Sequence, residues 1–274
     1  MAYKRILTIQ DISCVGQCSL TVALPILSAC GHETCILPTA MLSTHTGGFQ
    51  QPVVRQLAGA MEEMAAHWQR EKITFDAIYV GYLGSIPAIE STARILDTML
   101  APEGVSIVDP AMGDNGTLYS GFDMDYAAAM KGLCKKADII LPNITEAALF
   151  ARRPFQEELT EAYVNCLMDG LEHPCAVLTG VGYAPEETGI LMGVGSHRNY
   201  YRHPKLSRSF HGTGDIFASC FVGSLMQGKS LQRSVEIAAE IVQLSIRNTM
   251  GSPAHWYGIK FETALPELIR LLGL

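Results

Sequence analysis

The sequence lacks the features that mark several common classes of protein. No run of about 18 apolar residues occurs, so we expect no membrane span. The first apolar stretch, Met1 to Gln10, is too short for a secretory signal and leads into polar residues. No cluster of Lys and Arg occurs and the formal net charge is −7, so a nucleic-acid surface is not expected. We therefore expect a cytoplasmic protein that acts on small molecules.

Charged residues are scarce, at 17% of the chain, while apolar residues reach 48%. This composition favours a large hydrophobic core and argues against disorder. A length of 274 residues suits one large α/β domain or two small ones. No interdomain linker, low-complexity segment or internal repeat is visible, so we predict a single domain over residues 1–274.

Known metal and nucleotide signatures are also missing. The closest pair of the eight cysteines, Cys14 and Cys18, has no second pair at zinc-finger spacing, which favours small, reduced, buried residues. The pattern G-x-x-x-x-G-K-[ST] is absent, and no G-x-G-x-x-G follows the first predicted strand. The motifs of protein kinases are absent too. These absences exclude a P-loop enzyme, and they leave a dinucleotide-binding fold and a protein kinase without their sequence signatures.

What the sequence does contain is a regular alternation of strands and helices. It opens with a strand at Lys4–Gln10, a polar loop at Asp11–Gln17, a helix at Cys18–Cys30 and a strand at Thr34–Thr39. A β–loop–α–β order predicts a parallel sheet with right-handed crossovers. Ligands of such sheets bind beyond the carboxyl ends of the strands.

The rest of the chain continues the pattern. Further helices are predicted at Gln51–Lys72, Pro87–Leu100, Tyr126–Cys134, Asp215–Met226, Leu231–Asn248 and Phe261–Leu272. Further strands are predicted at Ala77–Val80, Val105–Val108, Ala137–Leu141 and Cys175–Thr179. Gly189–Val194 and His197–Arg202 have the pattern of a hairpin, which suits an antiparallel edge of a mixed sheet.

Polar side chains follow the first two strands. Asp11 and Ser13 lie on the loop after the first strand, where they either bind a ligand or cap the next helix. The segment Leu42–Phe49 is polar and glycine-rich and contains His45 and Thr46. It is either a plain turn or the rim of a polar substrate site.

Carboxylates and an amide follow two later strands. Asp109 and Asp114, with a proline and a glycine among the four residues between them, can ligate Mg²⁺ directly or through water, although the same residues are common in turns. Asn143 and Glu146 follow the next strand, and Glu146 begins a helix whose dipole it would favour. Because the carboxyl ends of parallel strands share one edge, these four residues are candidates for a metal–phosphate site.

The chain is organised around Phe210–Ser219, a glycine turn that runs directly into an apolar helix. Gly212, Thr213 and Gly214 at the helix start leave backbone N–H groups unpaired, and the helix dipole adds positive potential for an anion. Asp215 beside that anion can accept a proton from a substrate hydroxyl. The alternative is an ordinary N-capped helix. An anion cradle next to a base is what phosphoryl transfer to an alcohol requires.

Together these segments resemble the pyridoxal kinases of the ribokinase superfamily. The resemblance follows the family order along nearly the whole chain. The motifs that carry it are Ile9-Gln10-Asp11, Ser43-Thr44-His45-Thr46-Gly47, Gly81-Tyr82, Asp109-Pro110-Ala111-Met112-Gly113-Asp114, Leu141-Pro142-Asn143-Ile144-Thr145-Glu146 and Gly212-Thr213-Gly214-Asp215. It implies a three-layer sandwich with a mostly parallel central sheet and helices on both faces. It also implies ATP-dependent phosphorylation of the 5′-hydroxymethyl group of a vitamin B6 vitamer.

The resemblance assigns a role to each candidate residue. Asp215 would be the general base, and the N–H groups of Gly212, Thr213 and Gly214 would form the anion hole. Asp109, Asp114, Asn143 and Glu146 would hold Mg²⁺, its waters and the phosphates of ATP, with the three carboxylates as metal ligands and Thr179 and Gly180 near the triphosphate. Asp11, Ser13, His45, Thr46, Tyr82 and His211 would line the vitamer site. Family members are also helped by K⁺ and form homodimers.

Two positions depart from the family pattern. Asp11 stands where the family usually has a serine, so its carboxylate could bind a protonated ring nitrogen or the ring hydroxyl. His211 stands where a small apolar residue is common.

The nearest alternative is a hydroxymethylpyrimidine kinase, but that subfamily tends to carry Cys after Gly-Thr-Gly. A ribokinase-like sugar kinase would need an N-terminal lid insertion, and a catalytically silent vitamer or nucleotide binder would have no need of Asp215.

Overall fold

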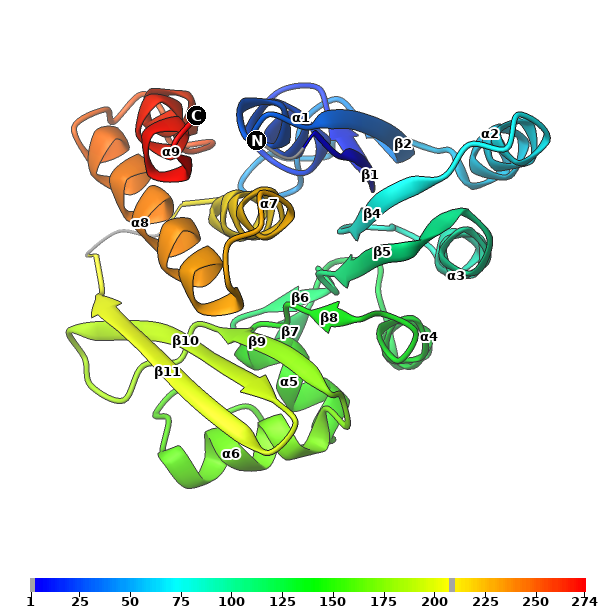
Figure 1. The fold of residues 1–274 in the computed structure, drawn as a ribbon. Helices are drawn as coiled ribbons and strands as arrows, with labels where there is room; N and C mark the ends of the chain where they lie inside the picture. The colour runs from blue at the N-terminus through cyan, green and yellow to red at the C-terminus, as the bar shows by residue number, and fades with distance from the viewer. Residues whose placement is uncertain (1–2, 207–209) are drawn as a thin grey trace. The chain divides into compact units, whose positions relative to one another are not determined.

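The computed structural model describes residues 3–206 and 210–274, so Met1 and Ala2 of the N-terminal stretch lie outside the described residues (Figure 1). By its contacts the chain divides into two compact units. The first comprises Met1–Gly104 and Leu206–Leu274, and the second comprises Val105–Lys205. The single domain over residues 1–274 stays a prediction.

The first unit is built on four neighbouring strands in the order β4-β1-β2-β3. They span Arg5–Ser13 (β1), Glu33–Leu42 (β2), Val54–Gln56 (β3) and Phe75–Val80 (β4). β1 pairs in parallel with β2 and with β4, and β3 pairs antiparallel with β2. The parallel arrangement predicted from the β–loop–α–β order is confirmed.

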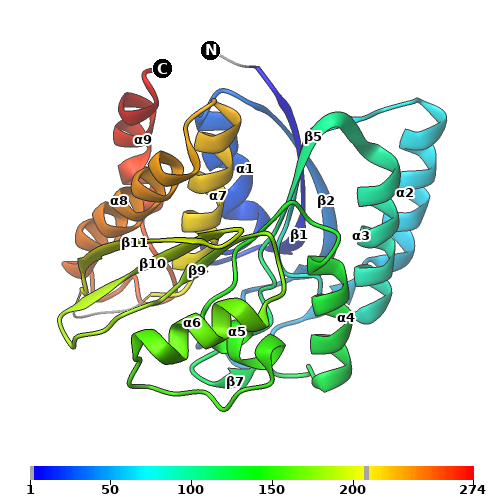
Figure 2. The same cartoon turned by 60° about the horizontal axis from the view of Figure 1, so that its bottom comes forward.

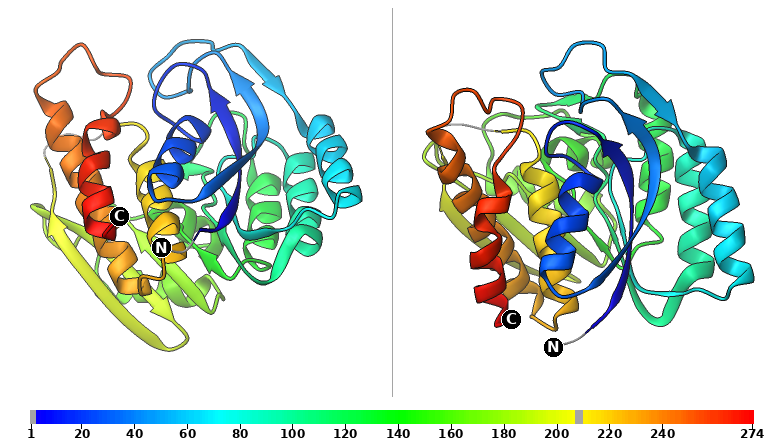
Figure 3. Two further views of the ribbon diagram at one scale, coloured as in Figure 1. Left: turned by 45° about the horizontal axis from the view of Figure 1, so that its top comes forward. Right: turned by 90° about the horizontal axis from the view of Figure 1, so that it is seen from above.

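Helices cover both faces of this part of the sheet. In Figure 3, α1 (Leu20–Ala29) and α7 (Thr213–Met226) lie on one side of β1 and β2, and α2 (Ala58–Arg70) and α3 (Ile86–Met99) lie on the other. α8 (Leu231–Met250) packs on α7, and α9 (Leu265–Leu272) follows a short 3₁₀ turn at Phe261–Ala264. Ile6, Leu7 and Ile9 of β1 are fully buried, because both faces of a parallel strand are covered.

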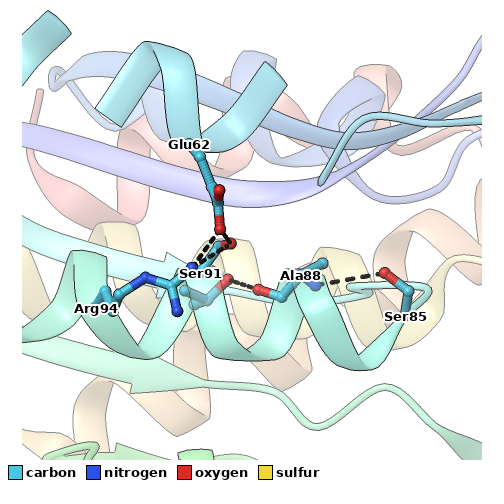
Figure 4. A network of polar contacts seen from close by, with 6 residues as sticks. Glu62, Ser85, Ala88, Ser91 and Arg94 are labelled. Carbon is cyan, nitrogen blue, oxygen red and sulfur yellow. Dashed lines mark hydrogen bonds and ion pairs between the residues drawn. The ribbon is translucent and has the colours of Figure 1, made fainter. Parts of the chain in front are cut away.

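A polar network joins the two helices on the second face (Figure 4). Glu62 of α2 accepts hydrogen bonds from Ser91 (3.0 Å) and from Arg94 of α3. Ser85 caps α3 by accepting a bond from the N–H of Ala88 (3.4 Å), which satisfies one of the unpaired donors of the first turn. Pro87 stands in that first turn, as predicted.

The helix predicted at Gln51–Lys72 is shorter than expected. Val54–Gln56 instead forms the exposed edge strand β3, and the helix begins at Ala58. The N–H of Leu57 bonds to the carbonyl of Thr39 (2.9 Å), so the backbone before the helix completes the edge of β2. Helical spacing of apolar residues could not reveal this, because pairing with a sheet edge is a backbone interaction.

The second unit contains β5 (Leu100–Val108, from Val105 onward), β8 (Ile139–Ile140), β9 (Cys175–Thr179), β10 (Glu187–Val194) and β11 (His197–Pro204). β5, β8 and β9 run parallel, and β9, β10 and β11 are antiparallel neighbours, as the hairpin pattern predicted. β6 (Gly113–Asp114) and β7 (Thr117–Leu118) form a small hairpin after β5.

Three helices belong to this unit: α4 (Met124–Cys134), α5 (Ile144–Ala151) and α6 (Glu161–Gly170). α6 was not predicted. It is capped by Thr160 and buries Val164, Leu167 and Met168 while α5 packs beside it, as Figure 2 shows. The fold class predicted from the sequence, α/β with a mostly parallel sheet, is confirmed. None of the described helices is long and apolar enough to cross a membrane.

Candidate active site

The start of α7 is shaped by a glycine in a left-handed conformation. Gly212 has φ 86° and ψ 0°, and a Cβ at this position would run into the carbonyl oxygen of Gln17. Only glycine fits both the conformation and the approach. The helix begins at Thr213 with no side-chain cap, so its first N–H groups have no helical acceptors. The predicted glycine turn and helix start are confirmed, and its role as an anion hole stays a prediction.

Asp215 lies in the first turn of α7 and is half-buried. Burial raises the pKa of its carboxyl to about 7, and the negative charge of Asp11 adds to the rise. The backbone N–H of Ser19 and the thiol of Cys18 donate hydrogen bonds to it and oppose the rise. A carboxyl with a pKa near the working pH is suited to general base catalysis. We call Asp11, Cys18, Ser19, Tyr82 and Asp215 the Asp215 site.

The prediction that Asp11 and Ser13 lie on a loop is wrong. Both are among the last residues of β1. A bulge after Gln10 shifts the register, and the pairing with β2 continues through Ile12 and Ser13. Asp11 is buried, accepts a hydrogen bond from Ser13 Oγ to Oδ2 (2.9 Å) and accepts another from the Ser19 side chain. Burial nevertheless raises the pKa of Asp11. Since neither residue caps α1, the capping alternative is wrong.

Tyr82 follows β4 and faces Asp11. Burial, followed by the charge of Asp11, raises the pKa of its hydroxyl to about 12, so it remains a hydrogen-bond donor at neutral pH. Its carbonyl accepts a bond from Thr39 Oγ1 (3.0 Å). Gly81 before it allows close approach, because a Cβ there would lie 2.6 Å from Gln10 Oε1. The structure therefore brings Asp11, Ser13, Tyr82 and Asp215 into one region of the first unit.

The side chain of His45 is held by contacts within the protein itself. It is buried, its Nδ1 accepts a hydrogen bond from the N–H of Gly47 (3.1 Å), and its Nε2 contacts the carbonyl of Tyr257. These partners assign the neutral form with the proton on Nε2. The ring centroid lies 5.3 Å from that of His211, which is exposed, and Thr46 is exposed as well. Substrate contact by His45, Thr46 and His211 stays a prediction.

The second unit holds a buried carboxylate at the start of α5. Glu146 is 1% exposed and accepts hydrogen bonds from the N–H of Met112 to Oε1 (3.0 Å) and of Asn143 to Oε2 (2.9 Å). Asn143 Oδ1 in turn accepts a bond from the N–H of Glu146 (3.0 Å), which completes a capping box. Burial raises the pKa of Glu146 to about 7 against these bonds, and the charge of Asp114 adds to the rise.

Other predicted residues surround this carboxylate, and we call the group the Glu146 site. Asn143 Nδ2 donates to the carbonyl of Gly113 (2.8 Å), and Asn143 pairs in parallel with Thr179 at the end of β9. Gly180 follows with φ 77°. Asp109 Oδ1 accepts a bond from the N–H of Ala111 (3.2 Å), whose φ is 32°. The capping box and these contacts hold the ends of β5, β8 and β9 together.

Comparison with known proteins identifies the family. The model of the phosphomethylpyrimidine kinase family matches residues 24–258. The chain belongs to this family. A pyridoxal kinase from Lactobacillus plantarum is 33% identical with a TM-score of 0.90, over 98% of this chain and 97% of that chain. The predicted kinase activity and the predicted ribokinase-like fold are thereby confirmed at the level of the family.

Two further relatives show the breadth of the family. A putative phosphomethylpyrimidine kinase from Bacteroides thetaiotaomicron is 34% identical with a TM-score of 0.92, over 97% of this chain and 94% of that chain. A second crystal form of that protein contains pyridoxal. The hydroxymethylpyrimidine/phosphomethylpyrimidine kinase of Bacillus subtilis is 28% identical over 188 residues, 66% of this chain and 67% of that protein. Family membership therefore leaves the choice between the two ring systems open.

Mg²⁺ is the metal expected for a kinase of this family, and the Glu146 site fits it as a hydrated ion. Both oxygens of Glu146 already accept backbone N–H groups, whereas Asp114 is exposed and Asp109 is half-buried. Among the described residues no group of three or more His, Cys, Asp and Glu is placed to hold a metal directly. A hydrated Mg²⁺, which keeps several waters, fits this set better than a bare ion does. Metal binding by Asp109, Asp114 and Glu146 stays a prediction.

Sequence reasoning missed two members of the Asp215 site, Cys18 and Ser19. Both fall at the predicted start of the first helix, where a serine reads as a cap and a cysteine as core. Their contacts with Asp215 depend on α7 packing against α1, which local sequence does not show.

Proposed function

We propose that this chain transfers the γ-phosphoryl group of ATP to the 5′-hydroxymethyl group of a vitamin B6 vitamer. The observation that carries the proposal is the place of the Asp215 carboxyl in the first turn of α7, next to backbone N–H groups that have no helical acceptor and no side-chain cap. A base and an anion cradle at one helix start are the two elements that an alcohol acceptor and a phosphate need.

The proposed reaction is one in-line displacement. Asp215 accepts the proton of the substrate hydroxyl as that oxygen forms a bond to the γ-phosphorus. The bond between the γ-phosphorus and the bridging oxygen breaks, and ADP leaves with the electron pair. The N–H groups of Thr213 and Gly214 would stabilise the charge on the transferred group.

The proposal assigns the vitamer to the Asp215 site and the nucleotide to the Glu146 site. Asp11 and Tyr82 would bind the ring and its substituents, while Asn143, Thr179 and Gly180 would bind the phosphates. Bound Mg²⁺ would neutralise phosphate charge, held through water by Asp114, Asp109 and Glu146. The homodimer, the help from K⁺ and a cytoplasmic location are part of the proposal and rest on the family resemblance.

Two observations favour the vitamer over hydroxymethylpyrimidine as the acceptor. Position 215 is an aspartate, whereas the pyrimidine kinases tend to carry a cysteine there. The relative from Bacteroides thetaiotaomicron, 34% identical, has been crystallised with pyridoxal. The pyrimidine remains the second candidate, because the matching family model is that of phosphomethylpyrimidine kinase.

The test is a coupled assay of ADP release with Mg²⁺ and K⁺, offering pyridoxal, pyridoxamine, pyridoxine and hydroxymethylpyrimidine separately. We expect turnover of the B6 compounds at a kcat/KM well above that of the pyrimidine. Preference for the pyrimidine would move the protein to the second candidate. No turnover of any of the four would overturn the proposal and favour a silent binder.

A further inference from the structure

A short hairpin of the second unit carries Asp114. Its strands β6 and β7 pair Gly113 with Leu118 and Asp114 with Thr117. The turn between them is Asn115–Gly116, whose φ values of 50° and 79° are both positive, as two-residue hairpin turns favour. A ladder this short is not stable by itself. Local sequence therefore favours the turn, while contacts with other elements decide where the hairpin lies.

Two hydrogen bonds hold the beginning of the hairpin against the first turn of α5, beside which it lies in Figures 1 and 2. The N–H of Met112 donates to Oε1 of Glu146 (3.0 Å), and Nδ2 of Asn143 donates to the carbonyl of Gly113 (2.8 Å). Both bonds come before Asp114 along the chain, so they do not fix the segment that follows it.

Thr145, in the same turn of α5, holds the turn of the hairpin. The N–H of Gly116 donates to its Oγ1 (3.0 Å), and Thr145 is 2% exposed. The hairpin ladder does not use that N–H, because its last pair is Asp114 with Thr117. A Cβ on Gly116 would lie 2.7 Å from Cδ1 of Phe155, so this ring packs against the turn as well. The turn is thus held by one hydrogen bond and one aromatic ring.

Helix α5 does not need the hydroxyl of Thr145. Its capping box is complete without this residue. A threonine further along a helix bonds to the carbonyl four residues earlier, as Thr92 does to Ala88 (2.8 Å), but in the first turn the helix has no such carbonyl. A valine of the same shape would serve the helix equally well. The contact with Gly116 is therefore what distinguishes a threonine at this position.

We propose that Thr145 is a positioning residue that holds Asp114 in place, relative to Glu146, for binding hydrated Mg²⁺. Oδ1 of Asp114 accepts a bond from the N–H of Asn115 (2.8 Å), so its carboxylate is tied to the turn that Thr145 holds. Mg²⁺ demands near-ideal octahedral geometry, so the groups around its waters must keep their spacing. The inference rests on the part of the proposed function that places Mg²⁺ and nucleotide at the Glu146 site, and it is independent of the acceptor.

The test compares Thr145→Val, which removes the hydroxyl and keeps the shape, with Thr145→Ser, which keeps the hydroxyl. The control is Thr160→Val at the N-cap of α6, where the threonine also accepts a backbone N–H, that of Tyr163 (3.2 Å). Calorimetry gives the Kd of ADP with and without Mg²⁺. We expect Thr145→Val to raise the Kd about tenfold with Mg²⁺, the scale for losing a group that orients a metal ligand. Without Mg²⁺ the change should stay below about threefold, as it should under both conditions in Thr145→Ser and Thr160→Val.

Two further measurements test the connection through Asp114. In an Asp114→Asn background, Thr145→Val should change the Kd of ADP with Mg²⁺ less than about threefold, because the carboxylate that it positions is gone. Amide hydrogen exchange at Gly116 should be slow in wild type, faster in Thr145→Val and unchanged in Thr160→Val. The wild-type exchange rate needs no variant, so it tests the contact even where Thr145→Val does not fold.

Several results would overturn the inference. They are an equal rise of the Kd with and without Mg²⁺, the same rise in Thr145→Ser or Thr160→Val, an undiminished effect of Thr145→Val in the Asp114→Asn background, and fast exchange of the Gly116 amide in wild type. Failure of Mg²⁺ to strengthen ADP binding to wild type would overturn it too. If Mg²⁺ strengthens ADP binding but no vitamer is phosphorylated, only the proposed function falls.

Discussion

The negative charge of Asp11 adds to burial in raising the pKa of the Asp215 carboxyl to about 7. The two residues come from distant parts of the chain, the end of β1 and the start of α7. Hydrogen bonding from Ser19 lowers the pKa of both carboxyls and so opposes the rise. The site therefore sets the base strength of Asp215 with a neighbouring charge as well as with burial.

The first prediction concerns the pH dependence of turnover. Asp215 must be ionised to accept a proton, so kcat should fall about tenfold per pH unit as the pH drops below about 7. Asp11→Asn removes the neighbouring charge, so the acidic limb should move to lower pH. The measurement is kcat from pH 5 to 9 at saturating vitamer and ATP. A limb in the same place in both proteins would contradict this account.

Much of this arrangement is visible in the sequence, and the rest depends on tertiary structure. Alternating strands and helices predicted the parallel strands. The glycine turn placed Asp215 in the first turn of its helix, and the polar residues after a predicted strand placed Glu146 at the start of the next helix. The extension of β1 through Asp11 was not visible, because it depends on a bulge and on pairing with β2.

The same limit explains the other differences. The capping box of Asn143 and Glu146 follows a known pattern, but the bond from Met112 to Glu146 comes from a separate loop. The positive φ of Ser19 could not be predicted for a residue other than glycine, because neighbouring elements impose it. Local signals thus place residues on elements, while packing decides what each one contacts.

The second prediction concerns the choice of vitamer. A carboxylate at position 11 favours a substrate that carries a proton donor or a positive charge near the ring. Asp11→Ser should therefore lower kcat/KM for pyridoxamine about tenfold relative to pyridoxal, the scale of one charge-assisted hydrogen bond. The measurement is kcat/KM for pyridoxal, pyridoxamine and pyridoxine in both proteins. An unchanged ranking would show that Asp11 does not select among the vitamers.

The third prediction separates structural from metal-binding roles at the Glu146 site. Glu146→Gln replaces one accepting oxygen by a donor facing a backbone N–H, so it should lower the free energy of unfolding by about 1–3 kcal/mol. Asp114→Asn, at an exposed position, should leave stability within about 0.5 kcal/mol and raise the Mg²⁺ concentration needed for half-maximal activity. Urea unfolding and Mg²⁺ titrations of both variants give the comparison. Equal loss of stability in the two would refute the distinction.

The fourth prediction joins catalysis to stability at Asp215. Asp215→Asn should lower kcat about 10²–10⁴-fold, the scale of a positioned base, with ATP affinity retained. The folded-state pKa of about 7 lies above the ordinary value of 3.8, so the folded protein is more stable when this carboxyl is protonated. This contribution to the free energy of unfolding is fully present below about pH 4 and is lost as the pH rises through about 7.

The asparagine variant has no charge to bury. It should therefore be more stable than wild type at pH 8, by at most about 4 kcal/mol, and the difference should vanish near pH 4. Denaturant unfolding at both pH values measures it, and Asp114→Asn, which removes an exposed carboxylate, is the matched control. Activity lost without the pH-dependent gain would mean that Asp215 is ionised in the folded enzyme at little cost. Stability gained without loss of activity would remove Asp215 from the role of base.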